Sequence, residues 1–114
     1  MASNGVVITS DATYKKDVHA IENPVAKIVN LKGVSYLWKT DEYEDKNFPQ
    51  GRHYGVIAQE VEKILPEVVS TTPDGAKAVA YTEIIPILIE ALKEQQSKID
   101  QLEKKLEEIM TRLN

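Results

Sequence analysis

The last third of the chain, residues 82–114, reads TEIIPILIEALKEQQSKIDQLEKKLEEIMTRLN and has the most regular pattern of the sequence. It lacks glycine, and its one proline, Pro86, falls in the first turn, where a helix tolerates it. Nine positions follow one another at alternating intervals of three and four residues, which makes four heptads. Eight of the nine residues are apolar. The nine are Ile85, Leu88, Leu92, Gln95, Ile99, Leu102, Leu106, Ile109 and Leu113. We call these nine residues the seam, and they predict one long amphipathic helix.

The composition of the seam favours a trimer. With Ile85 at position a of the heptad, the d positions are Leu88, Gln95, Leu102 and Ile109, and the other seam residues are at a. Isoleucine and leucine are mixed at both positions, whereas a dimer prefers β-branched residues at a and leucine at d. Gln95 forms a single polar layer, which fixes register at some cost in stability. Packing of the helix on its own domain is the less favoured alternative. A helix of about 33 residues would span ~50 Å, which is longer than a small domain. We therefore predict a parallel homotrimeric coiled coil, in which Lys98 would pair with Glu103 of a neighbouring chain.

The preceding residues predict a small α+β domain of short strands and helices. Strands are expected at residues 6–9, 34–38, 68–70 and 78–81. The last two flank Pro73-Asp74-Gly75, a strong turn signal, so they should form a hairpin. Helices are expected from Asn23-Pro24 to Gly33 and from Gly55 to Leu65. The charged residues 40–51 suit a loop or the tip of a hairpin.

Composition excludes several classes of function. The formal charge of −4 argues against a nucleic-acid surface, which is normally basic. No apolar run approaches the ~20 residues of a membrane span, so no membrane partner is expected. The chain has no cysteine, which rules out disulfides and thiolate sites. Its two histidines, His19 and His53, are too far apart in sequence to make a metal signature, so no metal and no cofactor are expected.

Six short motifs follow one another in an order that resembles the chaperone-of-endosialidase family, peptidase S74. They are SD (residues 10–11), KKDV (15–18), VSYLW (34–38), GVIAQEV (55–61), LPEVV (65–69) and VAY (79–81). The resemblance covers residues 10 to about 96, with the coiled coil as a typical appendage. This family occurs at the C-terminus of phage endosialidase tailspikes, tail fibres and neck appendages, and in some membrane-bound transcription factors.

The resemblance implies an intramolecular chaperone. Members help the upstream fibre polypeptide of the same chain to fold and trimerise, and then cut themselves free. Carried over, the nucleophile is Ser10, the base is Lys15, and the scissile bond is Thr9–Ser10. Residues 1–9 would then be a stub of the fibre, residues 10–81 the chaperone and self-cleavage domain, and residues 82–114 the coiled-coil helix. The implied location is the bacterial host cytoplasm during phage assembly, with the domain absent from the mature virion fibre if it is cleaved.

The implied serine–lysine dyad makes physical demands on the chain. A lysine acts as a base only when neutral, so its pKa must lie well below the reference value of ~10.4. Lys16 would push in that direction and is also the rival base. Residues five apart on a straight strand point to opposite faces. Ser10 and Lys15 therefore meet only if residues 11–13 turn the chain, or if the pair forms across subunits.

Three points stay open at this stage. His53 either supports assembly of the site or is an ordinary loop histidine. Gln59 and Glu60 either bridge to a neighbouring subunit or form the polar face of a helix. The whole module is alternatively a trimerisation clamp that does not cleave, or a self-cleaving oligomerisation module of a membrane-bound transcription factor.

Overall fold

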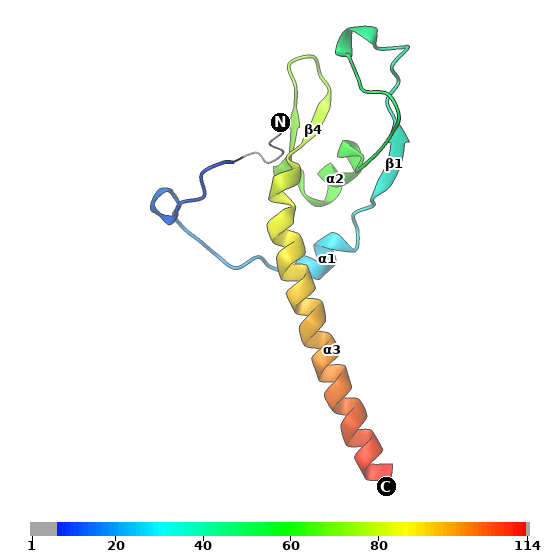
Figure 1. Cartoon of the computed structure of the whole chain (residues 1–114). Coiled ribbons are helices and arrows are strands. Elements are labelled where there is room, and N and C mark those ends of the chain that lie inside the picture. The colour runs from blue at the N-terminus through cyan, green and yellow to red at the C-terminus, as the bar shows by residue number, and fades with distance from the viewer. Residues whose placement is uncertain (1–6, 114) are drawn as a thin grey trace.

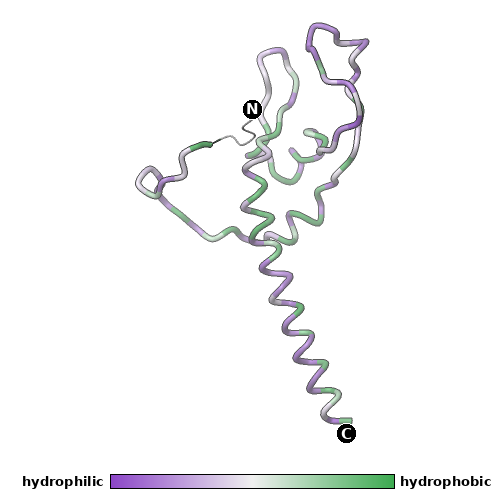
Figure 2. Tube along the Cα trace, viewed as in Figure 1, coloured by the Kyte–Doolittle hydropathy of each residue, from purple (hydrophilic) through white to green (hydrophobic). Residues whose placement is uncertain are grey.

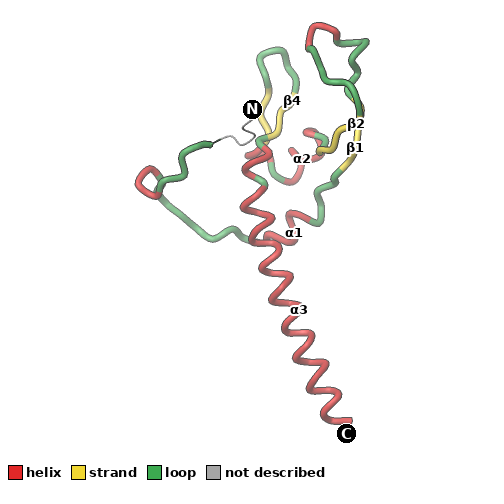
Figure 3. Tube along the Cα trace, viewed as in Figure 1, coloured by secondary structure: helices red, strands yellow, loops and turns green. Residues whose placement is uncertain are grey.

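The computed structural model describes residues 7–113 and shows a body of short helices and strands attached to the upper part of one long helix (Figure 1). The regular elements are α1 (Pro24–Ile28), β1 (Val34–Leu37), β2 (Arg52–Gly55), α2 (Ala58–Ile64), β3 (Val69–Thr71), β4 (Lys77–Val79) and α3 (Ile85–Leu113). Figure 3 shows how short the strands are beside α3. The predicted α+β body with a long C-terminal helix is confirmed, and the molecule is elongated, 70 × 39 × 35 Å.

Two antiparallel hairpins supply all the strands of the described chain. β3 pairs with β4 from Val69↔Val79 to Thr71↔Lys77, as the turn signal predicted, and Gly75 takes the positive φ of 93° that the turn needs. β1 pairs with β2 from Val34↔Gly55 to Leu37↔Arg52, so residues 40–51 do form a hairpin tip. The prediction missed β2, and it began the following helix too early, because α2 starts at Ala58.

The first helix begins as predicted and ends early. Pro24 is its first residue, and Asn23 before it has a positive φ of 51° and makes no side-chain cap. The prediction of a helix up to Gly33 is wrong, since α1 stops at Ile28. The Asn30 side chain donates to the Ala26 carbonyl oxygen at 2.9 Å, and the Leu31 amide donates to that of Ile28 at 3.0 Å. This closure turns the chain towards β1.

The predicted first strand is also wrong for the residues that the structure describes. Residues 7–10 have no regular structure, and Val6 lies outside the described part. β-branched residues form a strand only where a neighbouring strand accepts their hydrogen bonds. Residues 7–20, which we call the strap, are exposed without exception and loop out on the side of α3 opposite β1 (Figure 1).

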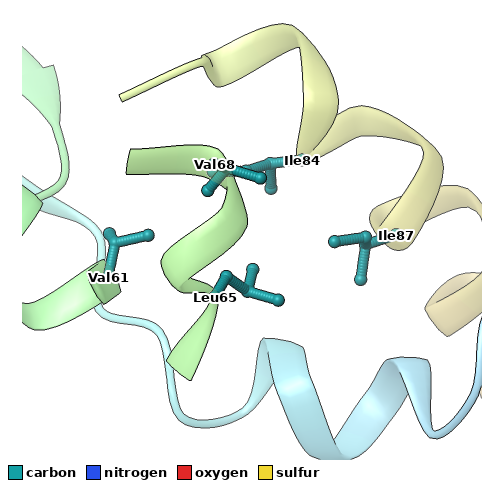
Figure 4. Close-up of a cluster of buried hydrophobic side chains, with 5 residues drawn as sticks. All are labelled: Val61, Leu65, Val68, Ile84 and Ile87. Atoms are coloured by element: carbon teal, nitrogen blue, oxygen red, sulfur yellow. The ribbon is translucent and has the colours of Figure 1, made fainter. Parts of the chain in front are cut away.

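The core of the body is small and lies where α2 meets the start of α3 (Figure 4). Its buried side chains are Val61, Leu65, Val68, Ile84 and Ile87. Val61 and Leu65 come from one face of α2 and its end, as the spacing of four predicts. A short 3-10 turn, Tyr81–Glu83, delays the long helix to Ile85, three residues after Thr82, the predicted cap.

Helix α3 carries two apolar stripes. Ile84, just before its first residue, and then Ile87 and Ala91 are buried against the body. The seam lies on a different face and is exposed along its whole length, from 43% for Leu88 to 79% for Leu113. Figure 2 shows apolar residues crowded in the first turns and widely spaced in the half that protrudes beyond the body. In residues 7–113 no helix is both long and apolar enough to cross a membrane.

Gly55 marks a close approach that gives a prediction for the fold. A Cβ there would lie 2.7 Å from Tyr81 Oη and 3.1 Å from Tyr36 Cε1. Gly55→Ala should therefore destabilise the body by about 1–3 kcal/mol through overpacking, measured as a lower midpoint of urea unfolding. Gly33→Ala is the matched control, because no atom lies within 4 Å of its added Cβ. Equal midpoints for the two variants would contradict the close packing of Tyr81.

Candidate functional site

A 3-10 turn in the strap, Ala12–Tyr14, folds the chain back between Ser10 and Lys15. The Asp11 carboxylate accepts a hydrogen bond from the Thr13 amide at 2.8 Å. The Tyr14 and Lys15 amides donate to the carbonyl oxygens of Asp11 and Ala12, both at 3.1 Å. The pKa of Asp11 is lowered, mainly by the hydrogen bond from the Thr13 amide and then by the one from the Thr13 side chain. The carboxylate is therefore charged at neutral pH and stabilises the turn.

This turn brings together two predicted site residues. Lys15 Nζ donates a hydrogen bond to Ser10 Oγ at 2.6 Å. The pair forms within one chain, so the turn required at residues 11–13 is present. Lys16 makes no such bond to Ser10 within residues 7–113, although it is adjacent in sequence. A nitrogen base within hydrogen-bond reach of a serine hydroxyl is the arrangement that nucleophilic catalysis needs.

The two carboxylates nearest to Lys15 in sequence are engaged elsewhere. Asp11 accepts from the Thr13 amide. Asp17 has a positive φ of 55° and its Oδ1 lies 2.7 Å from His19 Nε2. This leaves the Lys15 amine with the Ser10 hydroxyl as its side-chain partner in the described chain. An opposite charge bonded to the amine would hold its proton, which works against a base.

The surroundings of the pair are incomplete for catalysis in a single chain. Ser10 and Lys15 are both exposed, as are all other strap residues. A lysine loses its proton more readily when it is removed from water, and acyl transfer needs donors aimed at the developing oxyanion in a site that excludes water. Nothing in the strap itself provides that burial.

The candidate supporting residue His53 lies far from this pair. It belongs to β2, which lies beyond α3 from the strap (Figures 1 and 3). The His53 ring is 6.1 Å from that of Tyr36, centroid to centroid, and its Nε2 is buried with no hydrogen-bond partner among residues 7–113. The structure therefore does not place His53 with Ser10 and Lys15 inside one chain.

Sequence reasoning missed an open groove on the body. It lies between the two hairpins, above the start of α2, and its volume is about 900 Å³. Along one wall the Trp38 ring stacks on Phe48 at 4.4 Å and meets Tyr36 edge-on at 5.0 Å. Five exposed large apolar side chains of the body line the groove: Leu37, Trp38, Tyr43, Ile57 and Tyr81.

An ion pair joins the two hairpins at the mouth of this groove. Lys46, in the β1–β2 tip, donates to the carboxylate of Asp74, in the β3–β4 turn. Asp74 also accepts from the Thr72 hydroxyl and the Ala76 amide. The hydrogen bond from Lys46 is the main cause of a pKa of Asp74 held well below its usual range. The two hairpins are thus tied at their ends, and the groove stays open between them.

The fold places the chain in a broad class: a small α+β body on a long helix whose apolar seam is exposed. Comparison with known families is more specific: the family model for the chaperone of endosialidase, peptidase S74, matches residues 10–70. The chain therefore belongs to the chaperone-of-endosialidase family, a family of peptidases, as its motifs indicated. The match begins at Ser10, the predicted nucleophile.

Phage tail fibres are among the relatives of this chain. It is 35% identical over 105 residues to the long tail fibre protein Gp37 of Salmonella phage S16, and the aligned residues make up 90% of this chain and 14% of that protein. It is also 35% identical over 91 residues to the Gp37 of Escherichia phage AR1, covering 78% of the chain and 8% of that protein. The chain thus spans a small fraction of the length of these relatives.

Proposed function

We propose that the chain is an intramolecular chaperone that trimerises a phage fibre polypeptide and then releases itself by cutting Thr9–Ser10. Family membership supports the chaperone role, and the 2.6 Å hydrogen bond between Lys15 Nζ and Ser10 Oγ is the observation that carries the cut. Residues 1–9 are then the fibre side of the cleavage site, residues 10–81 the working domain and residues 82–114 the trimerising helix. Assembly takes place in the host cytoplasm, where the fibre is made.

The proposed reaction uses the backbone on either side of Ser10. Lys15, neutral when the site is assembled, takes the hydroxyl proton while Ser10 Oγ attacks the carbonyl carbon of Thr9. The bond from that carbon to the Ser10 nitrogen breaks, the nitrogen takes a proton, and an ester joins Thr9 to Ser10 Oγ. Water then hydrolyses the ester, which gives a carboxylate at Thr9 and restores the hydroxyl of Ser10, now the first residue of the released domain. Each molecule does this once.

The exposed seam supports the trimer. Eight large apolar side chains along one face of α3 contact no other part of the described chain closely enough to be buried. An apolar stripe of this length on a soluble protein marks an interaction surface, and its period of 3.5 residues is that of a left-handed coiled coil. Lys98 bonds to Glu94 of its own helix at 3.4 Å, so the expected pair with Glu103 of a neighbour would have to compete with this contact.

Mass and size measured on one preparation test the proposal. The expected result is a trimer whose chains span residues 10–114, together with the released upstream peptide. A trimer of uncut chains would refute the cleavage and support the alternative of a trimerisation clamp that does not cleave. Monomers of cut chains would refute the trimer. The fibre proteins among the relatives favour a fibre polypeptide upstream over the precursor of a transcription factor.

Lys15→Arg tests the role of the base. Arginine keeps the positive charge and a hydrogen-bond donor but does not deprotonate in proteins. We expect cleavage to slow by at least about a hundredfold, followed by the mass of the chain over time. Lys16→Arg is the matched control and should cleave as the wild type does. If Lys16→Arg is the slow variant instead, Lys16 is the base.

A further inference from the structure

We propose that the strap of each subunit docks in the groove of the next subunit around the trimer, so that two chains build each cleavage site. This inference rests on the proposed trimer. The fully exposed strap, with Val7 95% and Tyr14 79% accessible, is the first reason. The second is the open groove, which gathers most of the exposed large apolar side chains of the body.

The arrangement around α3 gives the direction. At about 100° per residue, the body stripe of Ile84, Ile87 and Ala91 lies about 100° to one side of the upper seam. The base of the strap, from Val18 to Ala20, and the following Ile21 share a shallow pocket with Pro86, Ile89 and Glu90. These three helix positions lie about 120° to the other side of the seam. Body and strap therefore flank the seam on opposite sides, and Figure 1 shows them on opposite sides of α3.

Three-fold symmetry turns this asymmetry into a contact between chains. The axis runs along the seam, so the side of one subunit that carries the strap faces the side of the next that carries the body. Such a head-to-tail interface closes into a ring after three copies. Ile21 packs against the core cluster of its own body, which anchors the strap and leaves its free part directed away from its own groove. To reach that groove the strap would have to reverse around α3.

Docking would supply what the single chain lacks. The apolar strap residues Val7, Ile8 and Tyr14 would be covered by the Tyr36, Trp38 and Phe48 wall. Ser10 and Lys15, which lie beside them in the strap, would leave water. Burial of the amine favours the neutral lysine that acts as a base. A chain that has not trimerised keeps its dyad in solvent, so cleavage would follow assembly.

Cross-linking tests the docking without relying on cleavage. The chain has no cysteine, so Tyr14→Cys and Gln59→Cys can be introduced together into Ser10→Ala, which keeps the strap attached. Gln59 lines the groove. A short bismaleimide should join each strap to the next groove and give covalent trimers on a denaturing gel. Links within one chain, or no links, would overturn the inference. Lys63→Cys replaces Gln59→Cys in the control, because Lys63 is exposed on α2 outside the groove, and should give no trimers.

Mixed trimers give an independent test. Gln59→Trp fills the groove and should slow cleavage about a hundredfold by displacing the strap, whereas Lys63→Trp should not. When Gln59→Trp chains are assembled with equal amounts of Ser10→Ala chains, about half of their straps face an open groove, so about half of them should be cut at the normal rate. No recovery would show that each strap uses its own groove. Sizing of the same samples separates the two proposals: loss of the trimer refutes the proposed function, and a trimer without recovery refutes only this inference.

Discussion

Ser10→Ala is expected to leave the chain uncut, with a trimer still formed. Removal of the nucleophile should lower the rate by about 10⁴-fold or more, because the Lys15 amine then has no hydroxyl to activate. Ser10 is exposed and lies in a strap without buried residues, so its loss costs the core nothing. Intact mass after prolonged incubation is the measurement, and unfolding midpoints should match those of uncut wild-type chains.

Ser97→Ala is the matched control for this change. Ser97 is exposed on α3 and lies outside the seam, so the variant should be cut as the wild type is. Cleavage of Ser10→Ala at the same bond would show that another group attacks, and the hydrogen bond from Lys15 would then be a structural contact.

Leu102→Lys is expected to abolish the trimer. Leu102 occupies a d position near the middle of the protruding half of α3 and is 65% exposed in the single chain. In the trimer this change would bring three ammonium groups to the axis, where each loses water without gaining an opposite charge, at several kcal/mol per ion. The molar mass from light scattering should fall to that of one chain.

Gln101→Lys introduces the same charge at the neighbouring position, outside the seam, and should leave the trimer intact. Leu102→Lys should also lose cleavage and Gln101→Lys should keep it, because in the proposed trimer the groove that covers each strap belongs to another chain. A Leu102→Lys protein that stays trimeric would mean that α3 associates through a different face.

The elements that the sequence predicted well are those in which the signal is local. The heptads of α3 and the Pro73-Asp74-Gly75 turn need no knowledge of the rest of the chain. β2 was missed because Arg52-His53-Tyr54-Gly55 has little β pattern of its own, and its conformation depends on pairing with β1. The strand expected at residues 6–9 failed for the reverse reason: Val7 and Ile8 favour a strand, but no described strand pairs with them.

The candidate site divides in a similar way. Ser10 and Lys15 were identified by resemblance, and the turn between them followed from the alternation of side chains along a strand. The Asp11 cap that makes this turn could have been predicted, since the side chain of aspartate commonly accepts a hydrogen bond from the backbone amide two residues further on and so starts a turn. The groove could not, because Trp38 and Phe48 meet across a loop and Asp74 reaches Lys46 from another hairpin. No periodicity connects these positions.

The small core of the body has a consequence for how stability is measured. Among residues 7–113 of the lone chain few apolar side chains are buried: Pro24, Val61, Leu65, Val68, Ile84, Ile87 and Ala91. A core of this size supplies a narrow margin over conformational entropy, and eight of the exposed large apolar side chains lie on the seam. With the proposed trimer, folding and association become one equilibrium, and the midpoint of thermal unfolding should fall as the protein is diluted. A melting temperature of this chain therefore has meaning only together with its concentration.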